Sequence, residues 1–247
     1  ATTNSLNLTG SGNFDSITDF DTVSSLDDFG GINSEGTYDF GGTAGGDTLD
    51  LGGVFSLDLK RHFLTEAFYP NDLIDSRTAN IDTWTDFDGA TATEVNAEML
   101  VRVTQDNPSS SPTYTAFQTF ANGTYKGRGF QFRAKLTSND VAQDIKVTQL
   151  GYTASLQRRT EQGNVTASGA GAKAITFTHP FFVGTSSLLG ANSNLPSVGI
   201  NAQNMASGDY FEVTNISGTG FTVHFKNSSN ASIDRNFTYQ AVGFGKG

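Results

Sequence analysis

Short runs in which every second residue is apolar restrict the fold of this 247-residue chain more than any other feature. In the stretch GFTVHFK the apolar residues are Phe221, Val223 and Phe225, and polar residues stand between them. The stretch EVNAEMLVRVT places Met99 and Val101 on one face in the same way. Successive side chains of a β-strand point to opposite faces, so this period predicts half-buried strands. No stretch keeps the period of an amphipathic helix, and the sequence therefore predicts an all-β protein.

Breaks between the runs divide the chain into four segments. Residues 1–35 are rich in Asp, Ser, Gly and Thr and predict an irregular acidic N-terminal arm. The strand spacing over residues 36–156 predicts a jelly-roll-like β-sandwich. Residues 157–172 carry no apolar period and predict a linker, and residues 173–247 predict a second, small β-sandwich. Strands are expected within residues 37–42, 47–63, 94–106, 113–120, 124–138, 144–156, 174–179, 195–204, 210–216, 220–229 and 236–247.

Charge is unevenly distributed along the chain, whose net charge is −10. Residues 1–110 hold 19 of the 25 acids and 4 of the 15 bases, a net −15, and the remainder carries a net +5. The acidic part repels nucleic acid and anionic bilayers, and the rest is too weakly basic to attract them strongly. No segment approaches the roughly 18 apolar residues of a membrane span. We therefore expect no nucleic-acid partner and no membrane insertion.

The segment DTWTDFDGATATE, residues 82–94, is the part of the chain most similar to a metal site. Asp86, Asp88 and Gly89 have the composition of a calcium loop, because hard cations bind clustered carboxylates. If Gly89 takes the turn position, however, Trp84 falls where the first carboxylate ligand is required. The chain has no cysteine, so it has no thiolate metal site or disulfide. We expect a solvated acidic loop and no bound metal.

Catalytic arrangements are not recognisable in the sequence. His62, His179 and His224 stand outside any H-x-x-H pattern, so we expect hydrogen-bonded histidines, although His179 and His224 could converge on a shared metal. No G-x-S-x-G is present to form a nucleophile elbow. Trp84 is the only tryptophan, and nothing pairs it with the two acids of a glycosidase. We expect no enzymatic activity, no catalytic residue and no cofactor.

Two stretches resemble proteins of known type. The stretch from MLVRVTQDNPSSSP to RGFQFRAKLTSND, residues 99–140, resembles a module of phage tail host-specificity, tail-tip or tail-fibre proteins. The stretch VGINAQNMASGDYFEVTNISGTGFTVHFKNSS, residues 198–229, resembles the C-terminal domain that follows it in such proteins, which is similar to small trimeric lectin-like β-sandwiches. Together the two matches cover roughly residues 95–247. The acidic first part has no such match.

This resemblance implies a non-enzymatic segment of a phage tail, located in the virion, that recognises the surface of the host cell. Its expected partners are a host glycan or protein receptor, other tail proteins and two further copies of the chain in a homotrimer. A carbohydrate-binding module of a secreted bacterial protein, or a purely structural tail component, stays open as an alternative.

The loop PFFVGTSSLLGANSN, residues 180–194, looks longer than the family pattern. Binding residues gather in loops on a rigid β scaffold, although a tolerated surface insertion would give the same length. Two phenylalanines in this loop offer apolar stacking and two asparagines offer hydrogen bonds, the chemistry that a neutral glycan requires. Two more asparagines follow the alternating run GFTVHFK. The candidate receptor-binding residues are Phe181, Phe182, Asn192, Asn194, Asn227 and Asn230.

Overall fold

The computed structural model describes residues 5–8, 32–41, 46–68, 80–83, 92–140, 143–185 and 188–246. These residues form an all-β protein with antiparallel sheets, and the helical turn among them is the 3-10 turn η5 (Ile81–Thr83). The predicted all-β, β-sandwich class is confirmed. No helix in this part of the chain is long and apolar enough to cross a membrane.

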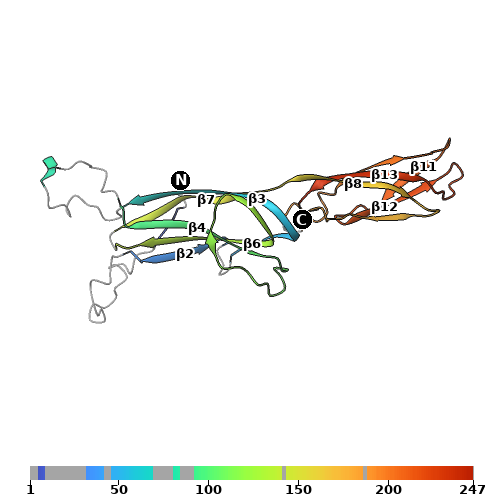
Figure 1. The fold of residues 1–247 in the computed structure, drawn as a ribbon. Helices are drawn as coiled ribbons and strands as arrows, with labels where there is room; N and C mark the ends of the chain where they lie inside the picture. The colour runs from blue at the N-terminus through green and yellow to red at the C-terminus, as the bar shows by residue number, and fades with distance from the viewer. Residues whose placement is uncertain are drawn as a thin grey trace.

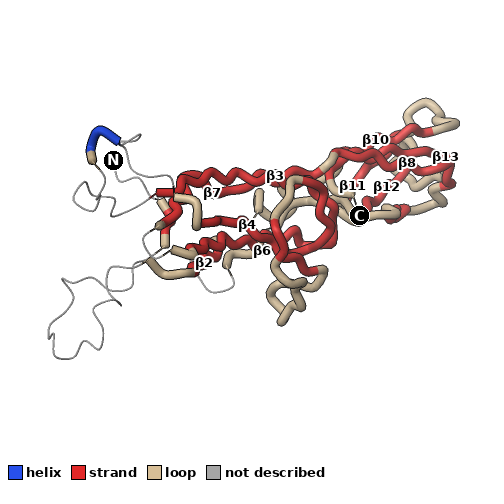
Figure 2. The backbone as a smooth tube through the Cα atoms, turned by 60° about the vertical axis from the view of Figure 1, so that its left-hand side comes forward, coloured by secondary structure: helices blue, strands red, loops and turns tan. Residues whose placement is uncertain are grey.

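The first seven strands form one seven-stranded sheet, which we call the N-terminal unit. They are β1 (Leu6–Asn7), β2 (Glu35–Asp39), β3 (Leu49–Phe68), β4 (Val95–Thr104), β5 (Gln118–Thr119), β6 (Gly123–Ser138) and β7 (Asp144–Leu156). The strand order is β1-β7-β3-β6-β4-β5, and β2 also pairs with β6. The sheet curls so that β3 and β7 lie opposite β4 and β6 (Figure 2).

The core of the N-terminal unit follows the alternation expected from the sequence. In β3 the side chains of Phe55, Leu57 and Leu59 are buried. In β4 Met99 and Val101 are completely buried, as their period predicts. All five side chains belong to one apolar cluster on the inside of the curled sheet.

The last six strands form two three-stranded sheets, which together we call the C-terminal unit. They are β8 (Arg158–Ala167), β9 (Lys173–Thr176), β10 (Ser197–Ala202), β11 (Tyr210–Thr214), β12 (Gly220–Lys226) and β13 (Asn236–Phe244). One sheet has the order β10-β13-β8 and the other β11-β12-β9. The two units follow one another along an elongated molecule (Figure 1).

The two sheets of the C-terminal unit share one apolar core. Strand β12 contributes Phe221, Val223 and Phe225, whose burial confirms the predicted alternation of this strand. Strand β13 contributes Phe237 and Ala241, which have no exposed surface. Since these strands belong to different sheets, the sheets pack face to face.

The predicted linker at residues 157–172 is wrong over most of its length. Its residues Arg158–Ala167 form β8, which pairs with β13 along the edge of a sheet. Gln157 separates β7 from β8, and residues 168–172 form the connection into β9.

The inward positions of β8 explain why it shows no apolar period. Arg159 lies over the ring of Phe181 instead of placing an aliphatic side chain in the core. Glu161 accepts a hydrogen bond from a backbone N–H, and Gly163 leaves space for the ring of Tyr239. The core-facing positions of this strand are thus held by two charged residues with partners and by a glycine.

The expected strand at residues 113–120 is also mostly wrong, because only Gln118–Thr119 is a strand. The preceding residues lie along β4 as an irregular segment. The guanidinium of Arg102 lies 4.8 Å from the ring centre of Tyr114 and 4.6 Å from that of Phe117. Cation–π contacts with these aromatic rings therefore hold the segment against the sheet.

Part of the predicted N-terminal arm is ordered on the sheet. Residues 9–31 lie outside the described residues, but Leu6–Asn7 form β1 on the edge of β7. Leu8 is buried, and its N–H donates to Oδ1 of the buried Asp144 at 3.2 Å. Residues 6–8 are therefore held on the sheet by a carboxylate as well as by apolar contacts.

The junction between the two units is a packed contact. Phe55 of β3 lies edge-on to Phe182, with ring centres 5.9 Å apart. The backbone N–H of Ser56 donates to the carbonyl of Lys246, and that of Phe182 donates to the carbonyl of Phe244. The C-terminus of the chain lies at this junction (Figure 1).

Candidate binding surfaces

The structure divides the predicted receptor-binding residues between two places. The loop at residues 180–194 lies at the junction, because it follows the end of β9 that is nearest the N-terminal unit. Asn227 and Asn230 lie at the opposite end, in the connection that follows β12. The six residues therefore do not form one site.

Phe181 and Phe182 are wrong as receptor contacts, because only 2% and 3% of their surfaces are exposed. As neighbours in an extended segment they point to opposite sides. Phe181 enters the core of the C-terminal unit, where its ring centre lies 5.0 Å from that of Phe177. Phe182 enters the core of the N-terminal unit beside Phe55. The pair joins the two cores and offers no surface to a ligand.

The two asparagines of the junction loop have different environments. Asn192 is exposed and has a left-handed backbone, with φ of 55°. Asn194 is partly buried, and its Nδ2 donates to the carbonyl of Phe182 at 3.4 Å. Asn194 therefore supports the loop, whereas the side chain of Asn192 is open to solvent.

An apolar cavity of about 420 Å³ lies beside Asn194 at the junction. Its walls come from both units and include Leu49, Leu57, Leu189 and Phe244. Leu189 is 69% exposed at its rim. The cavity lies where the curled sheet meets the junction loop, so it belongs to the contact between the units.

At the far end of the C-terminal unit, the connections 168–172, 203–209 and 227–235 lie together, and we call them the distal loops (Figure 1). Asn227 shapes one of them, because its Oδ1 accepts hydrogen bonds from the N–H groups of Ser229 and Ala231. Asn230 is exposed, and its Oδ1 accepts a hydrogen bond of 2.6 Å from the hydroxyl of Tyr210.

Charged contacts tie the distal loops to one another. Nε of Arg235 donates to Oδ2 of Asp209 at 2.9 Å, which joins the last two loops. Hydrogen bonds from the N–H of Ala206 and from Arg235 hold the pKa of Asp209 below its ordinary value. The N–H of Gly169 donates to Oδ1 of Asp234 at 2.8 Å and attaches the first loop. The distal loops thus form one connected end with a defined shape.

A second exposed surface of the C-terminal unit is a groove on the outer face of the sheet β10-β13-β8. The sequence did not predict this groove, because Gln162 and Asn164 of β8 fall in the predicted linker. The signal that was available is weak: Val165 and Thr166 are β-branched, which favours a strand.

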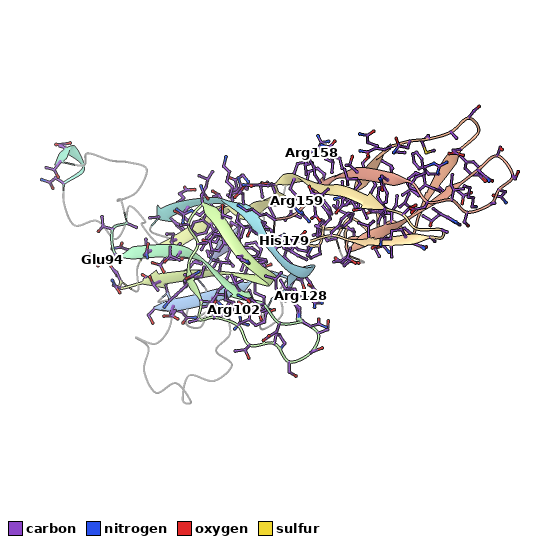
Figure 3. All side chains as sticks on the ribbon, turned by 45° about the vertical axis from the view of Figure 1, so that its right-hand side comes forward. Glu94, Arg102, Arg128, Arg158, Arg159 and His179 are labelled. Carbon is purple, nitrogen blue, oxygen red and sulfur yellow. The ribbon has the colours of Figure 1, made fainter. Side chains whose placement is uncertain are left out.

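The three histidines lie in different parts of the molecule. Nε2 of His62 lies 2.7 Å from Oγ1 of Thr153, and Nε2 of His224 lies 2.8 Å from Oγ of Ser232. His179 lies at the junction beside Arg159 (Figure 3), so it does not converge with His224, which lies near the distal end of β12.

Metal ligands do not gather in the part of the chain that the structure describes, where no group of three His, Cys, Asp or Glu side chains could hold an ion. Most of the acidic segment at residues 82–94 lies outside the described residues. The expectation of a solvated loop there stays a prediction.

Comparisons with known proteins found no match among family models, curated proteins or solved structures.

Proposed function

We propose that this chain is a segment of a phage tail fibre or tail tip that binds the surface of the host cell without catalysing a reaction. The observation that carries the proposal is the connected set of distal loops at one end of an elongated β protein (Figure 1). Loops fixed on a rigid scaffold are a common place for binding residues, and loops that are ordered before binding lose less entropy on contact. The resemblance of residues 95–247 to phage tail proteins supports the same function.

In this proposal the N-terminal unit faces the other tail proteins and the distal loops face the cell. The packed junction supports such an arrangement, because the buried pair Phe55 and Phe182 couples the orientation of one unit to the other. The proposed assembly is a homotrimer in the virion tail. It rests on the resemblance to trimeric modules and on the small size of the C-terminal unit, which favours oligomerisation.

A carbohydrate-binding module of a secreted bacterial protein is the second candidate. The groove on the outer face of the sheet β10-β13-β8 favours it, because a long sheet surface suits an extended polysaccharide. Light scattering distinguishes the two candidates: a stable trimer supports the tail protein, and a monomer that binds polysaccharide supports the module.

Binding of fluorescently labelled protein to a panel of bacterial strains tests the proposed function. Asn230 and Asn192 form a matched pair, because both are exposed asparagines with a left-handed backbone, one at each end of the C-terminal unit. Replacement by glycine removes the side chain without straining such a backbone. We expect Asn230→Gly to weaken binding to a susceptible strain and Asn192→Gly to leave it unchanged. The reverse result would move the site to the junction loop, and binding to no strain would overturn the proposal.

A further inference from the structure

The groove on the outer face of the sheet β10-β13-β8 has a volume of about 540 Å³. This volume lies within the roughly 300–1,000 Å³ of ordinary ligand sites. Residues directly opposite in paired strands share a face, and Gly199, Gln240 and Gln162 lie opposite one another across the three strands. Asn201 lies opposite Thr238 in the next row. Gly199 has no side chain, so it lowers the floor of the groove between larger neighbours.

A β-bulge shapes the distal part of the groove. Phe237 pairs with Thr166 and Tyr239 pairs with Gly163, so two residues of β8 lie opposite the single residue Thr238 of β13. Those two residues are Asn164 and Val165, and both line the groove. Bulges redirect side chains and are frequent beside functional sites. Here the bulge places the side-chain amide of Asn164 and the exposed aliphatic side chain of Val165 at the groove.

The lining of the groove is polar but carries no charged residue. Five of its polar side chains, drawn from all three strands, make no hydrogen bond to another residue in the described part of the chain. They are Gln162, Asn164, Asn201, Thr238 and Gln240. Val165 is 56% exposed and adds an apolar contact.

The outer face of the other sheet is different. There Lys226 pairs with Glu212 at 2.8 Å, and His224 bonds to Ser232. The charged groups of that face and its histidine thus have partners, and the face includes both signs of charge. Of the two outer faces, only the sheet β10-β13-β8 offers a group of uncharged donors and acceptors that are free to bind a ligand among the described residues.

We propose that this groove binds an uncharged oligosaccharide. Side-chain amides donate and accept hydrogen bonds in equal measure, which matches the hydroxyl groups of a sugar. The absence of charge in the lining disfavours sialylated or uronic glycans, because a buried anion would lack a cationic partner. Val165 contacts the apolar face of a sugar ring, and the bulge at Thr238 sets the spacing of the hydrogen bonds.

The inference rests on the proposed function in that the oligosaccharide is taken to belong to the host surface. The groove opens beside two of the distal loops, since β8 ends at Ala167 and β10 ends at Ala202. A ligand in the groove can therefore continue onto the distal loops. A second copy of this chain is a different occupant, and the experiment below separates the two.

A matched pair of variants on β10 tests the groove. A Cβ at position 199 has the carbonyl oxygen of Gln240 as its nearest neighbour at 3.9 Å, so Gly199→Leu fits the fold and fills the groove. Ser197→Leu adds a similar side chain to the same face of the strand, outside the groove. Wild type and both variants are applied to an array of neutral, sialylated and uronic glycans, and their oligomeric state is measured by light scattering.

The expected result is that wild type binds neutral glycans, that Gly199→Leu weakens this binding about tenfold or more, and that Ser197→Leu does not change it. The affinity for a neutral glycan should also be equal at about 0.05 and about 0.5 M NaCl, because no charged pair is screened. Equal binding by all three proteins, binding of acidic glycans alone, or binding of no glycan would overturn the proposal. A change of oligomeric state in Gly199→Leu would overturn it too, since the groove would then be a contact between copies.

Host-cell binding by the same three proteins separates this inference from the proposed function. If cells are bound and Gly199→Leu binds them as well as wild type, the host-recognition proposal stands and the groove proposal fails. If neutral glycans are bound through the groove but no cell is bound, the groove proposal stands and the host-recognition proposal fails.

Discussion

The guanidinium of Arg159 lies 3.8 Å from the ring centre of Phe181. The same guanidinium donates to the carbonyl of Gly245 at 2.7 Å and to the carbonyl of His179. Figure 3 shows Arg159 where the two units meet. One side chain of β8 therefore holds the segment after β9 and the end of the chain in place.

Replacing Arg159 should destabilise this region. Arg159→Lys keeps the charge but loses the planar group that stacks on Phe181 and reaches both carbonyls. We expect the free energy of unfolding to fall by about 1–3 kcal/mol, measured by urea denaturation. Arg158→Lys is the matched control, because Arg158 is exposed, and it should change stability by less than about 0.5 kcal/mol. Equal effects of the two variants would contradict this role.

Gly163→Ala should also destabilise the C-terminal unit, because a Cβ at this position would overlap the ring of Tyr239. We expect the free energy of unfolding to fall by about 1–3 kcal/mol, which is typical of overpacking. Gly151→Ala in β7 is the control: its Cβ would meet open space, so little change is expected. When Tyr239→Leu is already present, Gly163→Ala should lower the free energy of unfolding by less, because the ring that the Cβ overlaps is gone. Additive effects in this double-mutant cycle would show that the ring is not responsible.

Strand β8 also shows which part of the fold the sequence pattern does not predict. The alternation of Phe221, Val223 and Phe225 predicted β12 correctly, because an apolar residue occupies each buried position. The inward positions of β8 hold Arg159 and Glu161, which have partners from other segments of the chain. A pattern confined to neighbouring residues contains no information about those partners, so the strand resembled a linker.

The candidate site was less predictable than the fold for a related reason. Phe181 and Phe182 have the composition of a stacking surface, but burial depends on which units meet, and the junction is a tertiary contact. The amides of Gln162 and Gln240 are far apart in sequence, and strand pairing places them side by side. Composition therefore indicated the kind of group that could bind a glycan, and only the strand register showed which of these groups lie together.

Acid should weaken the fold through Glu161. Burial raises the pKa of Glu161, but hydrogen bonds from the N–H of Thr178 and from Arg159 outweigh it, so the pKa lies below its ordinary value. A lowered pKa means that the carboxylate stabilises the fold above the unfolded pKa of about 4.3, and that this contribution is lost as the pH falls through the folded pKa.

The measurement is urea denaturation of wild type and Glu161→Gln at several pH values. At about pH 7 the variant should be less stable, and between about pH 5 and pH 3 it should lose less stability than wild type. Glu66→Gln serves as the control, because Glu66 is 59% exposed in its ion pair with Lys146. This variant should change the free energy of unfolding little at any of the pH values. Parallel pH profiles for wild type and Glu161→Gln would contradict the assignment.

The contact between Phe182 and Phe55 should set the rigidity of the whole molecule. Phe182 is 3% exposed and borders the junction cavity, so Phe182→Ala would enlarge an existing apolar space. We expect a loss of about 3–5 kcal/mol in the free energy of unfolding of the N-terminal unit. Small-angle scattering should show a wider distribution of distances, since the units would lose a shared aromatic contact.

Leu189→Ala is the control, because Leu189 lines the same cavity but is 69% exposed, and it should leave both measurements nearly unchanged. An unchanged scattering profile for Phe182→Ala would mean that the backbone hydrogen bonds of Ser56 and Phe182 hold the junction without the ring.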